Sequence, residues 1–383
     1  MQDVVIIGGG LAGLVSALEL ARAGFSVTLV ERKTYPFHKV CGEYVSNEVR
    51  PYVEALGVDL DGLGAARINR FYLSAPSGRL LTAPLDLGGF GISRYTLDDE
   101  LHRLGLAAGV EFRLGQTVED VQFADDRFSV SLSHGDLLSA RLVLGTFGKR
   151  TKLDKALNRT FIGRPGSASR SPYVGVKYHI TGIDFPKDVI ALHNFSEGYC
   201  GMSAIEDDKY CLCYLTTRDN VRTHGSIAAM EQAVLMQNPH LRAVFEQAGR
   251  HSATFLYDRP EVINEISFAP KRAVENHILM AGDAAGLITP LCGNGMAMAI
   301  HGAKLVSSLS ARFLQNDLDR PTLEGTYQTE WSRLFARRLW VGRTVQHLFG
   351  RTWLSEAAIA AFGLAKPALR TVMRQTHGEV IPA

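Results

Sequence analysis

The segment from Val4 to Glu31 limits the folds available to this chain more than any other part of its 383 residues. It begins with the short apolar run Val4–Ile7, which is typical of a buried parallel strand. Apolar residues at helical spacing follow between Leu14 and Ala21, and a second β-branched run ends at Glu31. The order strand, helix, strand predicts a βαβ unit with both strands in one parallel sheet.

Three glycines stand between the first strand and the helix at G-x-G-x-x-G spacing. Gly8 permits a tight turn, Gly10 lets the backbone approach a pyrophosphate, and Gly13 lets the helix pack closely on the sheet. The helix N-terminus offers unpaired N–H groups to phosphates, and Glu31 can accept hydrogen bonds from ribose hydroxyls. An α/β turn without a nucleotide is the alternative, and the acid in its expected place disfavours it. The predicted dinucleotide site comprises Gly8, Gly10, Leu11, Ala12, Gly13 and Glu31.

The composition is that of an ordinary globular protein, with 46% hydrophobic and 21% charged residues. A chain of this length suits two intergrown domains better than one core. The net charge of +2 gives no reason to expect a nucleic-acid partner. No stretch reaches the ~18 consecutive apolar residues of a membrane span, and the run at Val4 follows only Met1-Gln2-Asp3. We therefore expect that run to be the first strand and not a signal peptide.

The five cysteines are scattered along the chain and odd in number. Cys211 and Cys213 alternate within an expected strand, but no second pair at metal-ligand spacing accompanies them. We therefore expect neither a structural metal site nor a disulfide framework, and a reducing cytoplasmic setting. The other three are Cys41, Cys200 and Cys292.

The strands expected for the nucleotide-binding half are discontinuous, because they come from residues 4–30, 110–145 and 278–281. Alternating strands between Tyr173 and Leu215 predict an antiparallel sheet inserted between the last two of these segments. Further expected elements are a hairpin over 68–83 and helices over 47–56, 226–248 and 296–378. The predicted division is a nucleotide-binding domain (1–70, 90–155 and 268–310), an antiparallel-sheet domain (71–89 and 156–267) and a C-terminal helical region (311–383).

A second glycine-rich region lies between Ala281 and Met296, after another short buried strand. The strand delivers an acid within Gly282-Asp283-Ala284-Ala285-Gly286, and the loop Gly293-Asn294-Gly295 precedes a further helix. An acid after a strand is often only a helix cap. The second loop argues against that alternative, because two helix N-termini then serve one ligand that is too large for a mononucleotide.

The pairing of the first glycine motif with GDAAG…GNGMAMAI near residue 282 resembles the flavoprotein family of the para-hydroxybenzoate hydroxylase fold. That family includes aromatic hydroxylases, flavin-dependent halogenases and geranylgeranyl reductases, and the resemblance covers about the first 310 residues. It implies an α/β fold with a Rossmann-like FAD-binding domain, an inserted antiparallel-sheet substrate domain and a C-terminal helical region. It also implies FAD, with its adenosine half on Gly8–Glu31, its ribityl or pyrophosphate portion at Asp283 and its isoalloxazine ring against Pro290–Met296. A helix N-terminus beside the ring would stabilise reduced flavin by about 0.3–2 kcal/mol.

The loop Lys39-Val40-Cys41-Gly42-Glu43 is similar to the K-x-C-G loop of the geranylgeranyl reductase branch. Arg94 matches an arginine that this family places near FAD, and a solvated charge at a helix start is the alternative. The Cys41 thiol could touch flavin or substrate, or it could be a small buried loop residue. The cofactor-binding residues that the resemblance adds are Arg32, Lys39, Cys41, Gly42, Arg94, Val118, Gly282, Asp283, Gly293, Asn294, Gly295 and Met296.

One segment departs from the family pattern. Aromatic hydroxylases of this fold carry an Asp-Gly pair after the strand at 140–145, where this chain has Phe147-Gly148. The family links that aspartate to FAD and NADPH engagement, so its loss disfavours NADPH-gated hydroxylation, while NAD(P)H stays a possible reductant. Lys149 and Arg150 could meet a pyrophosphate or an anionic partner, or form a solvated basic turn. Halogenation is also disfavoured, because the chain lacks the Trp-x-Trp-x-x-Pro segment of the halogenases.

Flavin carries the redox chemistry in such enzymes, so the protein supplies orientation, a proton source and exclusion of water. The segment Glu197–Met202 resembles a glycine-aromatic stretch that lines the pocket in the reductase branch. We predict no particular catalytic side chain. The pocket candidates are Cys41, Tyr199, Cys200 and Pro290.

The C-terminal helices are basic, because eight Lys and Arg residues between Trp331 and Arg374 accompany a single acid, Glu356. Basic helices with interleaved aromatic residues can lie on anionic membrane surfaces, cover a pocket or dock the acidic face of a carrier protein. A helical cap with a solvated basic face is the simplest alternative. The basic residues are Arg333, Arg337, Arg338, Arg343, Arg351, Lys366, Arg370 and Arg374.

We therefore predict an FAD-dependent oxidoreductase of the geranylgeranyl-reductase-like branch, acting on an apolar or lipid-like substrate of isoprenoid or polyketide type. Hydride would pass between flavin N5 and a carbon–carbon double bond. A flavin-dependent monooxygenase, either a hydroxylase or an epoxidase, is the first alternative. An electron-transfer flavoprotein that docks an acidic protein is the second. We expect a cytoplasmic monomer or dimer without a metal or a nucleic-acid partner, with peripheral membrane or carrier-protein contact through the basic helices.

Overall fold

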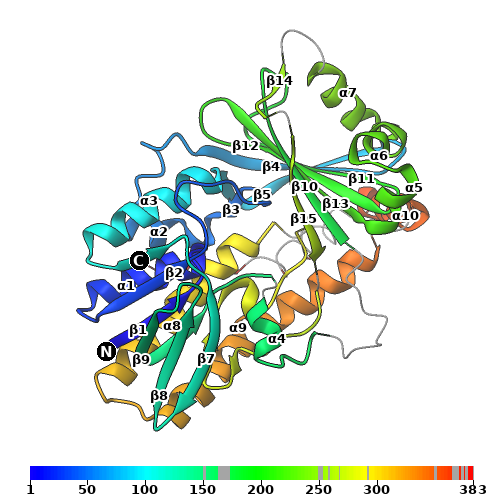
Figure 1. Ribbon diagram of the computed structural model, residues 1–383. Coiled ribbons are helices and arrows are strands. Elements are labelled where there is room, and N and C mark those ends of the chain that lie inside the picture. The colour runs from blue at the N-terminus through cyan, green and yellow to red at the C-terminus, as the bar shows by residue number, and fades with distance from the viewer. Residues whose placement is uncertain are drawn as a thin grey trace.

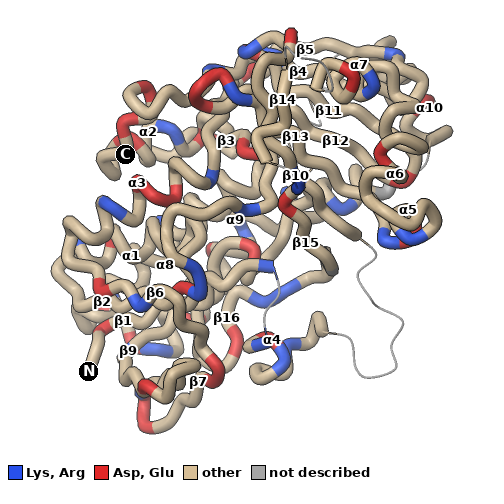
Figure 2. The backbone as a smooth tube through the Cα atoms, turned by 45° about the horizontal axis from the view of Figure 1, so that its top comes forward, with Lys and Arg blue, Asp and Glu red and all other residues tan. Residues whose placement is uncertain are grey.

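The chain folds around two sheets, one at the lower left and one at the upper right of Figure 1. The computed structural model describes residues 1–149, 152–162, 173–248, 253–257, 259–266, 268–290, 293–348, 352–364, 371, 375 and 378–382. Charged residues are spread over both halves in Figure 2. The predicted α/β class is confirmed, and helices follow the second glycine region as expected.

The first sheet has eight described strands, and its central strands are parallel. The order along its main path is β16-β17-β9-β1-β2-β6, so β1 lies between the next strand of the chain and a strand that follows it by more than 100 residues. This confirms the discontinuous strands predicted for this half. The strands are β1 (Gln2–Ile7), β2 (Val27–Glu31), β6 (Glu111–Leu114), β7 (Val118–Ala124), β8 (Arg127–Leu132), β9 (Leu137–Gly145), β16 (Val274–Glu275) and β17 (Ile278–Met280).

The second sheet has nine described strands. The four strands between residues 173 and 217 pair with one another, and each of these pairs is antiparallel. Its path is β14-β10-β13-β12-β11-β4-β5-β3, with β15 beside β10. The strand at 44–46, which precedes the predicted substrate segments, also pairs into this sheet. The strands are β3 (Tyr44–Ser46), β4 (Ala66–Ser74), β5 (Leu80–Gly91), β10 (Tyr173–Thr181), β11 (Val189–Phe195), β12 (Gly198–Ala204), β13 (Lys209–Thr217), β14 (Thr254–Phe255) and β15 (Glu261–Ile266).

Helices cover the two sheets in separate groups. The α-helices are α1 (Leu11–Arg22), α2 (Arg50–Ala55), α3 (Arg94–Ala107), α4 (Lys152–Ala156), α5 (Arg218–His224), α6 (Ile227–Ala233), α7 (Pro239–Ala248), α8 (Gly295–Leu314), α9 (Arg320–Leu348) and α10 (Thr352–Leu364). One core cluster joins the first sheet to α1, α8 and α9. A second core joins one face of the second sheet to α6 and α7, and a third joins the sheet to α9 and α10.

The first glycine motif forms the predicted turn between β1 and α1. Gly8 has a φ of +103°, which L side chains rarely adopt, so the chain turns sharply directly after the strand. A Cβ atom on Gly13 would lie 2.1 Å from the carbonyl oxygen of Gly8 and 2.7 Å from Oγ1 of Thr146. The helix therefore packs against its own turn at a distance that only glycine permits, as predicted.

The close approach at Gly13 predicts a large effect from one methyl group. Gly13→Ala should lower the free energy of unfolding by about 1–3 kcal/mol, because backbone atoms must move to admit the Cβ. Gly325→Ala is the matched control, since a Cβ there meets no atom within 4 Å and alanine is the better helix former. Urea denaturation monitored by circular dichroism measures both. Equal midpoints for the two variants would contradict the packing argument.

Candidate functional site

A cavity of about 1240 Å³ extends from the β1–α1 turn to the second sheet. It exceeds the roughly 300–1,000 Å³ of an ordinary small-molecule pocket, so it has room for a dinucleotide and a second molecule. The first residues of α1 and the first residues of α8 both line it. One cavity therefore joins the two helix N-termini that the sequence placed about 280 residues apart.

The turn before α1 presents backbone and one carboxylate to this cavity. Glu31 ends β2 and accepts hydrogen bonds from the backbone N–H of Gly9 (2.7 Å) and of Lys33 (3.1 Å). Its side chain lines the cavity beside Gly8 and Gly10. Glu31 therefore lies beside the position that a ribose bound on the glycine turn would occupy. Its hydrogen bonds from two backbone N–H groups hold its carboxylate in place.

Two cations and one acid form a buried group beside the glycine turn. Arg94 donates two hydrogen bonds of 2.7 Å to Asp98, and Lys39 Nζ donates to the same carboxylate (2.9 Å) and to the carbonyl of Gly9 (3.0 Å). Burial raises the pKa of Asp98, but Arg94 and Lys39 outweigh it and lower that pKa overall. The three side chains together carry one net positive charge. A Cβ on Gly10 would lie 3.8 Å from Arg94 Nη2, so this charge is within reach of a bound pyrophosphate.

The second glycine region forms the opposite wall. Gly282 and Gly293 have φ values of +61° and +64°, so both loops use backbone conformations that favour glycine. Two cations hold the backbone of the first loop. Lys271 Nζ donates to the carbonyl of Asp283 (2.6 Å), and the buried Arg159 donates to that of Ala284 (2.8 Å). The side chain of Asn294, at the start of α8, does not cap the first N–H groups of that helix. These groups are available to a ligand in the cavity.

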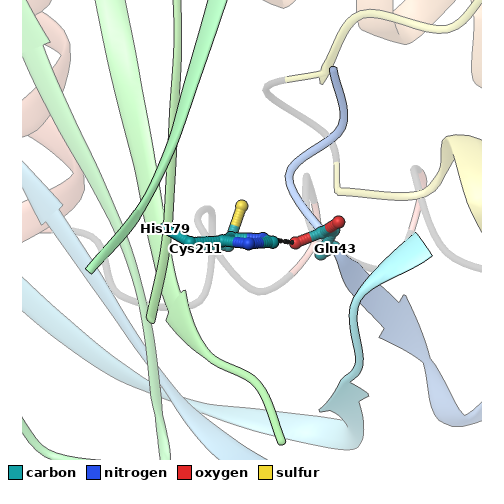
Figure 3. A group of neighbouring side chains, drawn as sticks. All are labelled: Glu43, His179 and Cys211. Atoms are coloured by element: carbon teal, nitrogen blue, oxygen red, sulfur yellow. Dashed lines mark hydrogen bonds and ion pairs between the residues drawn. The ribbon is translucent and has the colours of Figure 1, made fainter. Parts of the chain in front are cut away.

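A fully buried carboxylate joins the cavity loop to the second sheet (Figure 3). Glu43 accepts hydrogen bonds from Lys177 Nζ and His179 Nε2, each at 2.5 Å, and from the backbone N–H of Arg94 at 2.9 Å. Burial raises the pKa of Glu43, but Lys177 and His179 outweigh it and lower that pKa to about 2. Lys177 also donates to the carbonyl of Lys39 at 3.1 Å. Strand β10 therefore holds both ends of the 39–43 loop.

Glu43 and His179 lie beside Cys211 with a spacing that could suit a metal ion, since their ligand atoms are all within 4.8 Å of one another. The ammonium group of Lys177 already occupies the cationic position against Glu43. Cys211 Sγ donates to the carbonyl of Cys41 at 3.3 Å, and burial raises the pKa of this thiol well above its usual value. A neutral thiol and a paired carboxylate are poor metal ligands, so we interpret the group as a charge cluster that holds the loop.

The far end of the cavity is apolar. Its walls come from β4, β11, β12 and β15 of the second sheet and from the two C-terminal helices. Leu192, Ile266 and Tyr199 are buried there, with exposed fractions of 7%, 2% and 2%. The apolar side chains that line this end include Phe71, Leu73, Leu85, Ile190, Leu192, Ile263, Ile266, Val345 and Phe362.

The cavity brings together almost all of the residues predicted from the sequence. It is lined by Gly8, Gly10, Leu11, Ala12, Glu31, Arg32, Lys39, Cys41, Gly42, Arg94, Val118, Tyr199, Gly282, Asp283, Pro290, Gly293, Asn294, Gly295 and Met296. Gly13 is not on the lining, because its role is the packing of α1 described above. Phe147 and Lys149 also line the cavity, whereas Arg150 and Cys292 lie outside the described residues.

The prediction that Cys200 lines the pocket is wrong. Successive side chains of a strand point to opposite faces, so Tyr199 and Gly201 line the cavity while Cys200 packs into the core on the other face of β12. Burial raises the pKa of the Cys200 thiol well above its usual value. The residue is a core residue and takes no part in the site.

Comparisons with known proteins agree with this geometry. Residues 3–39 match the family described as FAD dependent oxidoreductase. The chain is 24% identical to conditioned medium factor receptor 1 of Dictyostelium discoideum, over 90% of this chain and 70% of that protein. It is 23% identical to digeranylgeranylglycerophospholipid reductase 2 of Methanothermobacter thermautotrophicus, over 88% of this chain and 85% of that protein. The myxobacterial chondrochloren halogenase has a similar fold, with a TM-score of 0.76, 19% identity and coverage of 96% and 90% of the two chains.

The chain is an FAD-dependent oxidoreductase. Its residues fit the cofactor on three observations: a glycine turn with an acid at the ribose position, net positive charge beside that turn, and a second helix N-terminus in the same cavity. Gly8–Ala12, Glu31, Lys39 and Arg94 would hold the adenosine half of FAD and its pyrophosphate. Asp283 and the start of α8 would hold the flavin half, where a helix N-terminus stabilises negative charge on the reduced ring.

Sequence reasoning missed several residues that build this site. Glu43 is expected from the sequence only as part of the 39–43 loop, and Lys177 and His179 lie within the strands expected between Tyr173 and Leu215 without an assigned role. The alternation of Lys177 and His179 along β10 places both on one face, and an ammonium group beside an imidazole on a buried face calls for an acid. This alternation is visible in the sequence, but Glu43, the acid that pairs with these residues, lies more than 130 residues away.

The depressed pKa of Glu43 predicts how stability depends on pH. A group whose pKa falls from 4.5 to about 2 on folding contributes stability above pH 4.5, and that contribution is lost as the pH falls toward about 2. The shift is on the order of 3 kcal/mol. Wild type should therefore lose more free energy of unfolding than Glu43→Gln between about pH 5 and pH 2, as measured by urea denaturation.

Two further variants control for general destabilisation. Glu43→Gln leaves buried cations unpaired and should cost about 3–5 kcal/mol at neutral pH, whereas Glu43→Gln with Lys177→Met should recover part of that loss. Glu54→Gln removes a half-exposed partner of Arg50 and should cost less than about 1 kcal/mol without changing the pH slope. Parallel pH profiles of wild type and Glu43→Gln would contradict the assignment.

Proposed function

We propose that the enzyme reduces a carbon–carbon double bond of an apolar, lipid-like substrate. The observation that carries the proposal is the apolar end of the cavity, which continues directly from the predicted flavin position into the third core cluster. Bound FAD supplies hydride transfer through its N5 atom. The chain's own residues supply a dry pocket, a fixed orientation and a route for the proton that completes the reduction.

The pocket excludes water by closing with side chains from both halves of the chain. Tyr199 Oη lies 3.5 Å from Thr289 Oγ1, and Thr289 is hydrogen-bonded to Gln346 of α9. This polar contact joins the second sheet, the loop before Pro290 and the C-terminal helices at one point. The apolar walls beyond it favour burial of a hydrocarbon chain by about 25 cal/mol per Å² of apolar surface removed from water.

A route for protons leads from the surface to the cavity through His38. Its Nε2 is hydrogen-bonded to Tyr257 Oη at 2.7 Å, and Tyr257 is 47% exposed. His38 also lines the cavity, on the same loop as Cys41. Burial, followed by Lys177 and His179, lowers the pKa of His38 and so favours the neutral imidazole, which can accept a proton at one nitrogen and release one from the other.

The relative in Methanothermobacter bears a name that describes reduction of an isoprenoid phospholipid. At 23% identity that name supports the lipid-like class and does not define the substrate of this chain. The loop Lys39–Gly42, which resembles the reductase branch, lines the cavity between its two ends. Both points favour reduction of an isoprenoid chain.

The proposed reaction has a direct test. The enzyme is reduced with dithionite in the absence of oxygen and mixed, in D2O, with a geranylgeranylated glycerophospholipid dispersed in detergent. We expect mass spectrometry of the product to show saturation of a double bond, with two solvent deuterium atoms incorporated per double bond and no oxygen added, because dithionite supplies only electrons and both hydrogens come from the solvent. Incorporation of label from ¹⁸O2 in an aerobic experiment would favour the monooxygenase alternative instead. Oxidation of the reduced enzyme by an acidic protein alone would favour electron transfer.

The apolar wall predicts the effect of one substitution on substrate binding. Phe71→Ser should raise the KM for the lipid-like substrate by roughly 10–100-fold, because a cavity-lining aromatic surface is lost. Tyr72→Ser is the matched control, since the neighbouring residue of β4 points to the opposite face and is not on the lining. The flavin absorption spectrum verifies that both variants retain FAD. An unchanged KM in Phe71→Ser would contradict the assigned pocket.

A further inference from the structure

Helix α10 is almost uncharged. Glu356 is its one charged residue, and its carboxylate accepts hydrogen bonds from the backbone N–H (2.8 Å) and the hydroxyl (3.0 Å) of Ser77 in the β4–β5 turn. The carboxylate serves to attach the helix to the second sheet, so the rest of α10 presents no charge to its surroundings.

The two faces of α10 are both apolar but have different neighbours. Ile359 is 1% exposed within the third core cluster, and Phe362, three residues on, lines the cavity. On the opposite face Trp353 is 65% exposed and Leu364 is 93% exposed, with Ala357 and Ala361 exposed between them. A single helix therefore separates the apolar cavity from an apolar outer surface.

Helix α9, which contacts α10, adds a basic and aromatic surface. Arg338 turns inward and pairs with Glu48 at 3.1 Å, and Arg333 pairs with Glu330. Arg337 is exposed beside Trp340, which is 62% exposed. Among the described residues, no ion pair involves Arg337. Two of the three tryptophans of the chain are thus largely exposed, and both lie on these two helices.

We propose that α9 and α10 dock on the surface of an anionic lipid bilayer, with Trp353 and Leu364 inserted and Arg337 against the headgroups. Tryptophan is favoured at membrane interfaces, and arginine beside an apolar helix face gives attraction to anionic lipid. None of the described helices has the length and hydrophobicity of a membrane span, so the contact is peripheral. As a deepening of the proposed function, the lipid-like substrate passes from the bilayer along α10 into the cavity.

The outer face of α10 fits a bilayer better than an acidic protein. A protein partner needs matching pockets and hydrogen-bonding groups, whereas this face offers alanine, leucine and one indole in an even surface. A bilayer requires only apolar area and charge complementarity. The inner face adds a reason specific to lipids, because Phe362 connects the same helix to the substrate cavity.

Docking is tested by cosedimentation of the full-length, FAD-loaded enzyme with vesicles. One preparation contains phosphatidylcholine alone, and the other adds phosphatidylglycerol. We expect binding to the anionic vesicles that weakens at high salt. In Trp340→Phe, whose remaining tryptophans are Trp331 and Trp353, vesicles should shift the emission to the blue, and lipids brominated on their acyl chains should quench it. Trp331 is only 6% exposed and serves as the constant background.

Matched variants separate α10 from general surface hydrophobicity. Trp353→Ser with Leu364→Ser should reduce the partition coefficient on anionic vesicles by at least about 10-fold. Leu137→Ser removes an equally exposed apolar side chain, at 66%, from the first sheet and should leave binding unchanged. Arg337→Glu should weaken binding to anionic vesicles and have little effect on neutral ones.

Three outcomes would overturn the proposal. The first is that the enzyme stays in the supernatant with both vesicle preparations. The second is equal binding of the vesicles by wild type and by Trp353→Ser with Leu364→Ser. The third is concentration-dependent self-association in analytical ultracentrifugation that this double variant abolishes, which would assign the face to a second copy of the chain. Vesicle binding involves no turnover, so it stands or falls separately from the proposed reaction. Reduction of a detergent-dispersed lipid without vesicle binding would overturn the docking alone.

Discussion

The buried contacts of Glu43 with Lys177 and His179 are the interaction on which the arrangement of this enzyme depends. They join a loop that lines the cofactor end of the cavity to strand β10 of the second sheet, across more than 130 residues of sequence. A buried ion pair adds little net stability compared with apolar packing, but separating it leaves uncompensated charges in the interior. Its consequence is therefore specificity: one position of the 39–43 loop against β10 satisfies the carboxylate, and this loop lines the cavity.

Glycines determine where the backbone, and not a side chain, faces the cavity. At Gly8, Gly282 and Gly293 the positive φ values turn the chain so that helix N-termini point inward. The charged side chains act differently at the two glycine regions. Asp98 neutralises one of the two cations at the first glycine turn. Lys271 and Arg159 instead donate hydrogen bonds to backbone carbonyl groups of the loop after Gly282. Backbone N–H groups and a limited net positive charge suit a ligand that is anionic in its middle and uncharged at its flavin end.

Most of the strands and helices could be predicted from the sequence, and nearly all of the predicted site residues line the cavity, because local patterns carry that information. Gly8, Gly13 and Glu31 follow from spacing, and Asp283 follows from its place after a buried strand. The error at Cys200 came from treating a six-residue segment as one wall, although alternation along β12 puts Cys200 and Tyr199 on opposite faces. The Glu43 cluster depends on a contact between distant segments, which no local pattern encodes.

Pairing between charged residues also decides how the surface of the C-terminal helices is interpreted. A basic residue count from the sequence alone could not distinguish a solvated face from a docking surface, because it does not say which arginines are already paired. Arg338 and Arg333 have partners within the fold, while Arg337 remains beside an exposed tryptophan. Likewise Glu356, the one acid of the region, is bonded to the β4–β5 turn. With these pairs accounted for, Phe362 lines the cavity on one face of α10 and Leu364 is exposed on the other, and the proposed delivery of a water-insoluble substrate along this helix rests on that arrangement.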